Sequence, residues 1–295
     1  LLQRAVASGH RIFELLDIPL AIADKPDAQP IGDTSGRIEF KDVTFGYDPE
    51  RPILRNISFV AEPGQTIALV GPTGSGKTSI TALAHRFYDV QEGSITIDGY
   101  DIRDVMQESI GDVMGMVLQE PFLFSKPVLE NVRYNTLDAT REDVVTACKV
   151  IGAHDFVMQL DNGYDTTLEQ RGSNLSVGQR QLLSFARALV ADPKILVLDE
   201  ATANIDSYTE RIIQDALKKL LAGRTALVIA HRLSTIRNAD RIIVVRDGEI
   251  TETGTHVELV ASDGLYAQLW KTNYASFDDI ADNADDIPRI PATST

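Results

Sequence analysis

The run Gly71-Pro72-Thr73-Gly74-Ser75-Gly76-Lys77-Thr78 has the composition of a loop that binds phosphate groups. It matches the pattern GxxxxGK followed by Ser or Thr at every fixed position. Glycines let backbone N–H groups converge on phosphate oxygens, and the start of a helix adds positive potential. We expect Lys77 to neutralise the β- and γ-phosphate oxygens and the Thr78 hydroxyl to bind Mg²⁺. A glycine-rich turn that binds nothing is disfavoured, because an apolar strand precedes the run and a helical stretch follows it.

Two adjacent carboxylates, Asp199 and Glu200, close the apolar stretch 195–198. Side chains at the end of a parallel strand emerge at the carboxyl edge of the sheet, where the phosphate loop is also expected. Asp199 would support the Mg²⁺ shell, and Glu200 would polarise the water that attacks a γ-phosphate. The alternative is an Asp-Glu helix cap after a buried strand, which a phosphate loop on the same sheet makes less favoured.

Three further motifs follow Lys77 in a fixed order. Gln119 stands in Leu118-Gln119-Glu120-Pro121, Ser176 in Leu175-Ser176-Val177-Gly178-Gln179, and His231 in Ala230-His231-Arg232. Together with the phosphate loop and the acidic pair, they resemble the nucleotide-binding domains of ABC transporters over roughly residues 37–275. The first two motifs resemble the Q-loop and the signature motif of that family.

The resemblance implies that ATP and Mg²⁺ are bound and that each motif has a role. Gln119 would contact Mg²⁺ or the attacking water, and His231 would contact the γ-phosphate. Tyr47 would stack on adenine, and Asp206 resembles the D-loop acid that communicates between subunits. Taken singly, these residues could be a surface glutamine, a structural histidine at a strand end, a strand aromatic and a helix-capping acid.

The signature motif combines a helix start with a substitution. Ser176 and Gln179 have the spacing of a capping box, so we expect a helix to begin here. Its apolar positions are Leu182, Leu183, Ala186 and Leu189. In the family, Ser176, Gly178 and Gln179 would reach the ATP held by a second nucleotide-binding domain in a head-to-tail dimer. Val177 stands where the family usually has a glycine, and its β-branched side chain conflicts with a close approach to phosphate.

This substitution motivates a hypothesis about the partner. Glu200 and His231 are intact, so the chain is equipped on its own catalytic face and impaired on the face it lends to the other domain. We therefore hypothesise a heterodimer, with a neutral substitution in a working homodimer as the alternative.

The elements that must position these residues follow an α/β pattern, with a P-loop NTPase core and a mainly parallel sheet. Short apolar strands are expected at 66–70, 116–118, 195–198, 226–230 and 242–245. Alternating residues at 38–45 and 57–59 predict an N-terminal antiparallel β subdomain. Residues 126–190 predict an inserted α-helical subdomain. Asp247-Gly248 predicts a hairpin turn, and the helix after the phosphate loop is expected to reach about Tyr88.

Composition limits the classes of partner. With 43 acidic against 28 basic residues and a net charge of −15, the chain lacks the basic footprint of a nucleic-acid binder. A single cysteine, Cys148, excludes an intrachain disulfide and a Cys-rich metal site and fits a reducing compartment. No run approaches the roughly 18 apolar residues of a membrane span, and the first residues lack Met and a signal pattern. We expect a piece of a longer protein.

Three regions are expected along the chain. Residues 1–36, with an amphipathic helix over 1–17, resemble the linker from the last transmembrane helix of an exporter. Residues 37–275 form the nucleotide-binding domain, and 276–295 form an acidic, disordered tail. We expect an ATP-hydrolysing exporter half of the multidrug or lipid type, at the cytoplasmic face of the cell membrane. Its partners would be the transmembrane domain of the same chain and a second nucleotide-binding domain. Alternatives are an importer, a soluble ABC ATPase and an ATP-binding regulatory module without turnover.

Overall fold

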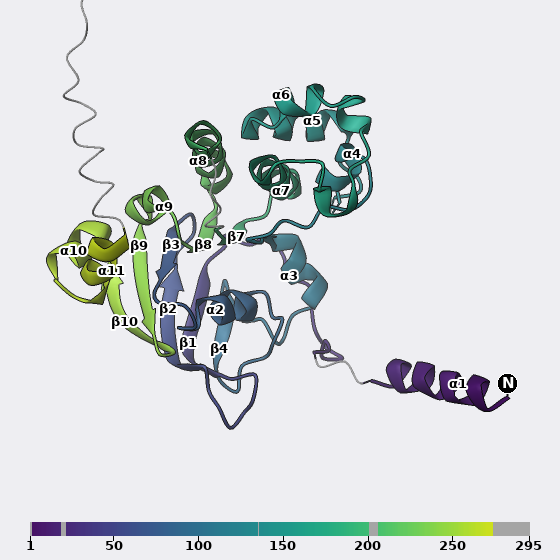
Figure 1. Cartoon of the computed structure of the whole chain (residues 1–295). Coiled ribbons are helices and arrows are strands. Elements are labelled where there is room, and N and C mark those ends of the chain that lie inside the picture. Colours follow the sequence, from purple (N-terminus) through teal and green to yellow (C-terminus); the bar gives the residue numbers. More distant parts are fainter. Residues whose placement is uncertain (1, 19–21, 135, 201–205, 274–295) are drawn as a thin grey trace, which may run out of the picture.

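The computed structural model describes residues 2–18, 22–134, 136–200 and 206–273 and arranges them as two β-sheets with a layer of helices (Figure 1). The strands are β1 (Ile38–Phe45), β2 (Leu54–Ala61), β3 (Thr66–Val70), β4 (Glu92–Ile97), β5 (Tyr100–Asp101), β6 (Met114–Val117), β7 (Ile195–Asp199), β8 (Thr225–Ile229), β9 (Arg241–Arg246) and β10 (Glu249–Gly254). The helices are α1 (Leu2–Leu16), α2 (Lys77–Ala84), α3 (Gln107–Val113), α4 (Val128–Val132), α5 (Arg141–Ile151), α6 (His154–Met158), α7 (Val177–Ala191), α8 (Ser207–Leu221), α9 (Leu233–Asn238), α10 (His256–Ala261) and α11 (Leu265–Asn273), with 3-10 turns η1 (Gly163–Asp165) and η2 (Gln170–Gly172).

The larger sheet confirms the mainly parallel arrangement predicted from the short apolar strands. Its order is β10-β9-β3-β8-β7-β6, in which β3, β6, β7, β8 and β9 run parallel and β10 pairs antiparallel with β9. The predicted hairpin turn joins these last two strands, and both Asp247 and Gly248 have the positive φ that such a turn requires. A Cβ on Gly248 would lie 2.0 Å from the carbonyl oxygen of Ile53, so this position accepts only glycine.

The side chains of the parallel strands alternate between two cores. On β3, Ile67 and Leu69 pack with the antiparallel sheet and with α2, whereas Ala68 and Val70 pack with the helical layer. Helix α2 is thereby buried between the two sheets through its apolar side chains. The start of α2, which follows the phosphate loop, is therefore held on a rigid base.

The smaller sheet is antiparallel, in the order β2-β1-β4-β5, as predicted for the N-terminal β subdomain. Strands β4 and β5 were not anticipated. Three predicted boundaries were wrong by a few residues. Strand β2 starts at Leu54 rather than 57, and β6 ends at Val117, leaving Leu118 exposed. Helix α2 ends at Ala84 rather than near Tyr88, because the chain turns at Arg86, whose φ is 52°.

The predicted helical subdomain contains α4 to α7, and α8 packs beside it (Figure 1). Helices α5 and α7 contribute to the same core as the apolar side of α8, which includes Ile213 and Leu217. The layer covering this face of the parallel sheet therefore includes a helix that follows β7.

The N-terminal helix α1 extends away from the sheets (Figure 1), and its Ile12, Phe13, Leu15 and Leu16 are exposed. By contrast, the segment from residue 22 to 36 is docked on the domain. The guanidinium of Arg86, 2% exposed, donates to the carboxylates of Asp89 and Asp24 and to the carbonyl oxygens of Val105 and Ala23. Among the described residues, no helix has the length and apolar character to cross a bilayer.

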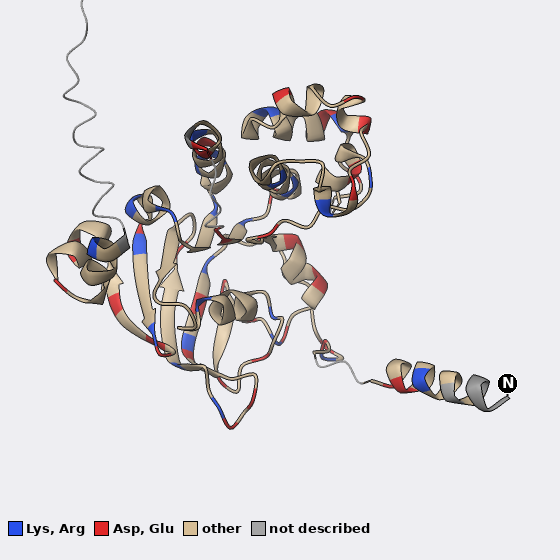
Figure 2. Ribbon diagram, viewed as in Figure 1, with Lys and Arg blue, Asp and Glu red and all other residues tan. Residues whose placement is uncertain are grey.

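Charged side chains are spread over most elements of the ribbon (Figure 2), and the described Lys and Arg residues do not gather on one broad face. The acidic run predicted at 276–295 lies outside the described residues.

Candidate functional site

The phosphate loop joins β3 to α2, and its glycines are required by their surroundings. A Cβ on Gly71 would lie 2.0 Å from the carbonyl oxygen of Val245, and one on Gly76 would lie 2.4 Å from Cδ2 of Leu54. Gly76 is the N-cap of α2 and offers the helix no side-chain acceptor. The first N–H groups of α2 are therefore available to phosphate oxygens, and the residues present fit a bound polyphosphate.

Lys77, the first residue of α2, is folded back over this loop. Its Nζ donates to the carbonyl oxygens of Gly71 and Pro72, at 2.8 and 2.9 Å, and to Oγ of Ser75 at 3.4 Å. Burial lowers the pKa of Lys77, and the negative charge of Asp199 partly opposes this shift. The ammonium group thus lies at the loop whose backbone would receive the phosphates, with the exposed Thr78 next to it.

The register of the larger sheet brings the ends of four strands, and the site residues predicted to follow them, to one edge of the sheet. Leu69 of β3 and Asp199 of β7 both pair with Ile229 of β8, and Val117 of β6 pairs with Leu198. The strands are parallel, so the loops that follow them open on the same side. These loops carry Gly71, His231, Glu200 and Gln119, in the strand order β3-β8-β7-β6.

Asp199, Lys77 and His231 interact electrostatically at this edge. Burial raises the pKa of Asp199, while the positive charges of His231 and Lys77 oppose the rise. Burial also lowers the pKa of His231, and repulsion from Lys77 adds to this effect. His231 is therefore biased towards its neutral form, in which a ring nitrogen can donate one hydrogen bond. Gln119 is exposed in the loop after β6.

The side chain of Glu200 is only 3% exposed. Its Oε2 accepts the N–H groups of His231 and Arg232, both at 3.2 Å, and its Oε1 accepts the Thr235 hydroxyl at 2.5 Å. Burial raises the pKa of Glu200, and these hydrogen bonds oppose the rise. Sequence reasoning missed Thr235 and Arg232; the only signal for them was their closeness to His231 in the chain.

Tyr47 lies beside the start of α2. Its hydroxyl is 3.3 Å from Oγ of Ser79, and its ring makes edge contacts with Phe45 and Tyr88, at centroid distances of 5.2 and 5.0 Å. The side chain is 55% exposed, so the ring can stack on a planar group near the phosphate loop.

The remaining predicted residues form a second group at the starts of α7 and α8. The capping box is confirmed: Oγ of Ser176 accepts the Gln179 N–H at 3.2 Å, and Oε1 of Gln179 accepts the Ser176 N–H at 2.9 Å. Gly178 packs against Thr209 of α8, where a Cβ would lie 2.4 Å from Cγ2. Val177 instead faces outward and is 40% exposed.

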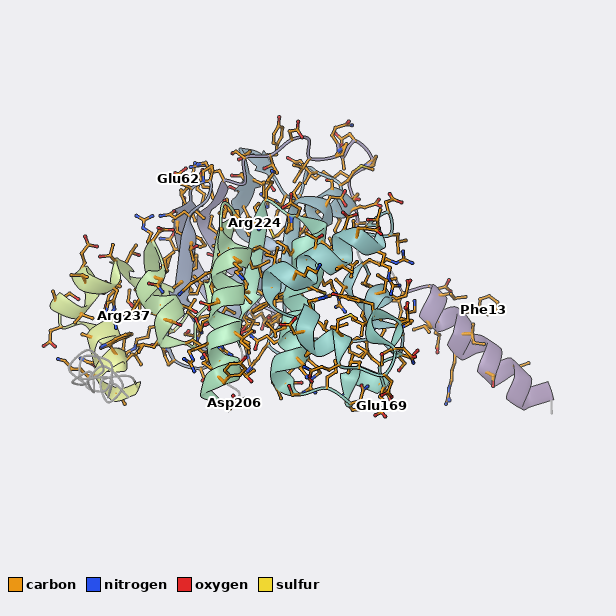
Figure 3. The ribbon with its side chains drawn as sticks, turned by 90° about the horizontal axis from the view of Figure 1, so that it is seen from above. Phe13, Glu62, Glu169, Asp206, Arg224 and Arg237 are labelled. Atoms are coloured by element: carbon orange, nitrogen blue, oxygen red, sulfur yellow. The ribbon has the colours of Figure 1, made fainter. Side chains whose placement is uncertain are left out.

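Asp206 caps α8, accepting the N–H groups of Tyr208 and Thr209 at 3.1 and 3.0 Å. Figure 3 shows Asp206 at one end of α8, on the body of the domain, with Phe13 of α1 standing apart. The other D-loop residues quoted from the sequence, Ala203, Asn204 and Ile205, lie outside the described residues.

The donor set fits a nucleotide-bound magnesium ion better than a metal site made by protein alone. Within the described ranges, no three His, Cys, Asp or Glu residues gather as metal ligands. Mg²⁺ in nucleotide sites is held by one or two protein oxygens together with phosphate oxygens and waters. Thr78, Asp199 and Gln119 can supply such a partial shell.

Comparisons with known proteins agree with this arrangement. The family model described as ABC transporter matches residues 54–203. The chain is 50% identical over 262 residues to a beta-(1-->2)glucan export ATP-binding/permease protein, NdvA, of Nitrobacter winogradskyi, covering 89% of this chain and 43% of the relative. It is 47% identical over 269 residues to an ATP-dependent lipid A-core flippase of Desulfotalea psychrophila, covering 91% and 47%.

A solved structure, that of a bacterial Atm1-family ABC exporter with ATP bound, matches with a TM-score of 0.86 and 40% sequence identity. The match covers 92% of this chain and 48% of the other. The chain thus spans about half the length of these relatives.

Proposed function

This chain belongs to the ABC transporter family, and from that premise we propose that it is the ATP-binding and ATP-hydrolysing domain of an exporter half-transporter. The observation that supports this most strongly is the common edge of β3, β8, β7 and β6. There the Lys77 ammonium group is hydrogen-bonded to the phosphate loop and interacts electrostatically with Asp199 and His231, and the loop after β6 carries Gln119.

Each residue has one task in this proposal. The N–H groups at the start of α2 and the Lys77 ammonium bind the phosphates, and Tyr47 stacks on the base. Thr78, Asp199 and Gln119 hold Mg²⁺, which neutralises phosphate charge when bound. Glu200 accepts a hydrogen bond from the attacking water, and His231 donates one to a γ-phosphate oxygen.

The partners are proposed from the same family membership. Residues 1–36 would join residues 37–275 to a transmembrane domain of the same polypeptide, at the cytoplasmic face of the membrane. Two relatives are an export protein and a flippase by name, and this supports export over import. A second nucleotide-binding domain would face Ser176, Gly178, Gln179 and Asp206, which lie together at the starts of α7 and α8.

The test of this function is Glu200→Gln, with Lys77→Ala as the comparison. Glu200→Gln should abolish ATP hydrolysis, leave ATP binding intact and strengthen ATP-dependent pairing with the partner domain, because the phosphate-binding groups remain. Lys77→Ala should instead weaken ATP binding itself. Unchanged turnover in Glu200→Gln would refute the role of this residue. ATP binding without turnover in the wild-type chain would favour a regulatory module.

We further propose that the partner domain is a different chain. Val177 projects an isopropyl group from the exposed first turn of α7, at the end that would approach the other domain's ATP. Gly178 cannot provide the close backbone approach in place of residue 177, because it packs against Thr209 of α8. Purification of the full-length transporter alone tests this: a symmetric dimer that hydrolyses ATP at both sites would overturn it.

A further inference from the structure

The carboxylate of Glu200 is enclosed by donors from the loop after β8 and from α9. Both of its oxygens are used, one by the N–H groups of His231 and Arg232 and the other by the buried hydroxyl of Thr235 in α9. A general base must lie within hydrogen-bond reach of the proton it accepts, directly or through one water. In this arrangement, the carboxylate of Glu200 is engaged by α9 and by the turn that precedes it.

The neighbouring carboxylate, Asp199, is not buried in this way. The two residues are consecutive at the end of β7, where successive side chains point to opposite faces. Asp199 is partly exposed at the edge that holds Lys77, whereas Glu200 is buried against Thr235. The residue assigned to the water is thus the one whose carboxylate is buried and hydrogen-bonded within the protein.

We propose that Thr235 is a positioning residue that holds Glu200 in a retracted resting position, from which the carboxylate must be released before it can polarise water. The proposal rests on the role in ATP hydrolysis proposed above for Glu200. Among the described residues, Oε1 accepts from one side-chain donor, the Thr235 hydroxyl, and a substitution can remove this contact without altering the backbone.

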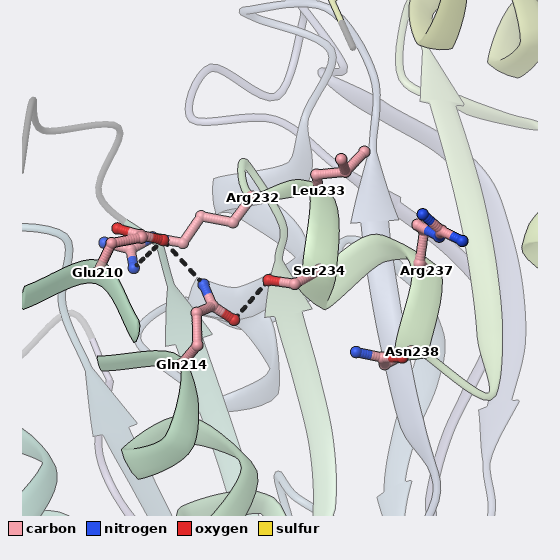
Figure 4. A pocket seen from close by; sticks show the side chains of 7 residues that line it. All are labelled: Glu210, Gln214, Arg232, Leu233, Ser234, Arg237 and Asn238. Atoms are coloured by element: carbon pink, nitrogen blue, oxygen red, sulfur yellow. Dashed lines mark hydrogen bonds and ion pairs between the residues drawn. The ribbon is translucent and has the colours of Figure 1, made fainter. Parts of the chain in front are cut away.

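Arg232 connects this resting position to the helices that would face the partner. Its backbone N–H donates to Glu200, while its guanidinium donates to Glu210 of α8 at 2.8 Å and to Gln181 of α7 at 3.4 Å. Figure 4 shows the contacts continuing from Glu210 through Gln214 to Ser234. A shift of α7 or α8 is therefore passed to the turn that holds Glu200, which gives docking of a partner domain a route to release it.

The experiment compares Thr235→Val with wild type, using the 295-residue chain at concentrations where its specific ATPase activity is constant. Valine keeps the β-branched shape and removes the hydroxyl, and loss of a hydrogen bond to a carboxylate shifts an equilibrium by about tenfold. We expect kcat to rise about five- to tenfold, with KM for ATP within about twofold. Thr235→Ser restores the hydroxyl and should return kcat to the wild-type value.

Thr251→Val is the matched control, because it makes the same substitution in β10, where the hydroxyl donates to the carbonyl oxygen of Val244 instead of Glu200. Its kcat should equal that of wild type. A second readout needs no catalysis: amide hydrogen exchange of His231 and Arg232 in the nucleotide-free chain. Exchange should quicken several-fold in Thr235→Val and stay unchanged in Thr251→Val, since both amides donate to the carboxylate that Thr235 fixes.

Two failures are distinguishable. If Glu200→Gln hydrolyses ATP at the wild-type rate, the proposed role of Glu200 fails, and the retraction proposal fails with it. If Glu200→Gln is inactive but Thr235→Val has an unchanged or lower kcat, or unchanged amide exchange, only the retraction is refuted. The variant Glu200→Gln/Thr235→Val should be inactive, since the gain in kcat acts through the Glu200 carboxylate.

Discussion

Replacing Gly178 by alanine tests how closely the start of α7 packs on α8. A Cβ here would lie 2.4 Å from Cγ2 of Thr209, far inside van der Waals contact. Overpacking of this kind costs about 1–3 kcal/mol, whereas Gly→Ala in a helix returns up to about 1 kcal/mol through backbone entropy. We therefore expect Gly178→Ala to lower the free energy of unfolding by about 1–2 kcal/mol, measured by urea denaturation of the 295-residue chain.

A second substitution should relieve the clash. Thr209→Ser removes the methyl group and keeps the hydroxyl that hydrogen-bonds to Asp206. In the double variant, the decrease in the free energy of unfolding should be at least about 1 kcal/mol smaller than the sum of the decreases in the two single variants. Gly111→Ala is the control, since a Cβ on this α3 residue would have nothing within 4 Å; it should be neutral or stabilising. Wild-type stability in Gly178→Ala, or simple additivity in the double variant, would refute the close packing of α7 on α8.

Three further predictions concern the linker and the base-binding residue. Partial burial raises the pKa of Asp98, but hydrogen bonds from Thr34, Ser35 and Arg37 outweigh it and lower the pKa to about 2. Because this folded-state pKa lies below the unfolded value, the stabilisation is present above about pH 4 and is lost as pH falls towards 2. Asp98→Asn should thus cost about 1 kcal/mol at pH 7, after allowance for solvent screening, and the difference from wild type should vanish as pH falls through about 2 in acid denaturation curves. Tyr47→Leu should weaken ATP binding about tenfold by loss of stacking, whereas Tyr47→Phe should change the affinity less than about threefold. Calorimetry with ATP and with tripolyphosphate separates binding of the base from binding of the phosphates. Equal losses of affinity for the two ligands would contradict stacking. Arg86→Lys removes the planar fork that binds several oxygens at once, so limited proteolysis within residues 22–36 should become faster, and an unchanged cleavage rate would count against the docking of this segment.

The parts of the fold that local sequence determines were predictable. The strand before the phosphate loop, the loop itself, the Asp247-Gly248 turn and the capping box at Ser176 each depend on neighbouring residues, and the structure has all four. Strand β4 was missed although Ile95 and Ile97 alternate, because its second residue is a glycine, Gly93, which packs against the backbone of Asp42. The end of α2 depends on a tertiary contact, the burial of Arg86.

The candidate site divides in the same way. Strand-end positions such as Asp199 and His231 follow from sheet topology, which the apolar strand pattern indicates. The direction of the Glu200 side chain depends on Thr235, whose approach to β7 is created only by the fold. The bond from Arg232 to Gln181 joins residues far apart in the chain, and no local pattern encodes it.

The docking of residues 22–29 has a mechanical consequence. The N–H of Met106 donates to the carbonyl oxygen of Gln29, and Arg86 grips Asp24 next to the start of α3. Helix α3 leads directly into β6, and Gln119 lies in the loop that follows this strand. A force applied to the chain before residue 22 would therefore act on a segment that is hydrogen-bonded to the domain. The Arg86 contacts therefore tie the segment before β1 to α3 and, through α3, to β6, the edge strand of the larger sheet.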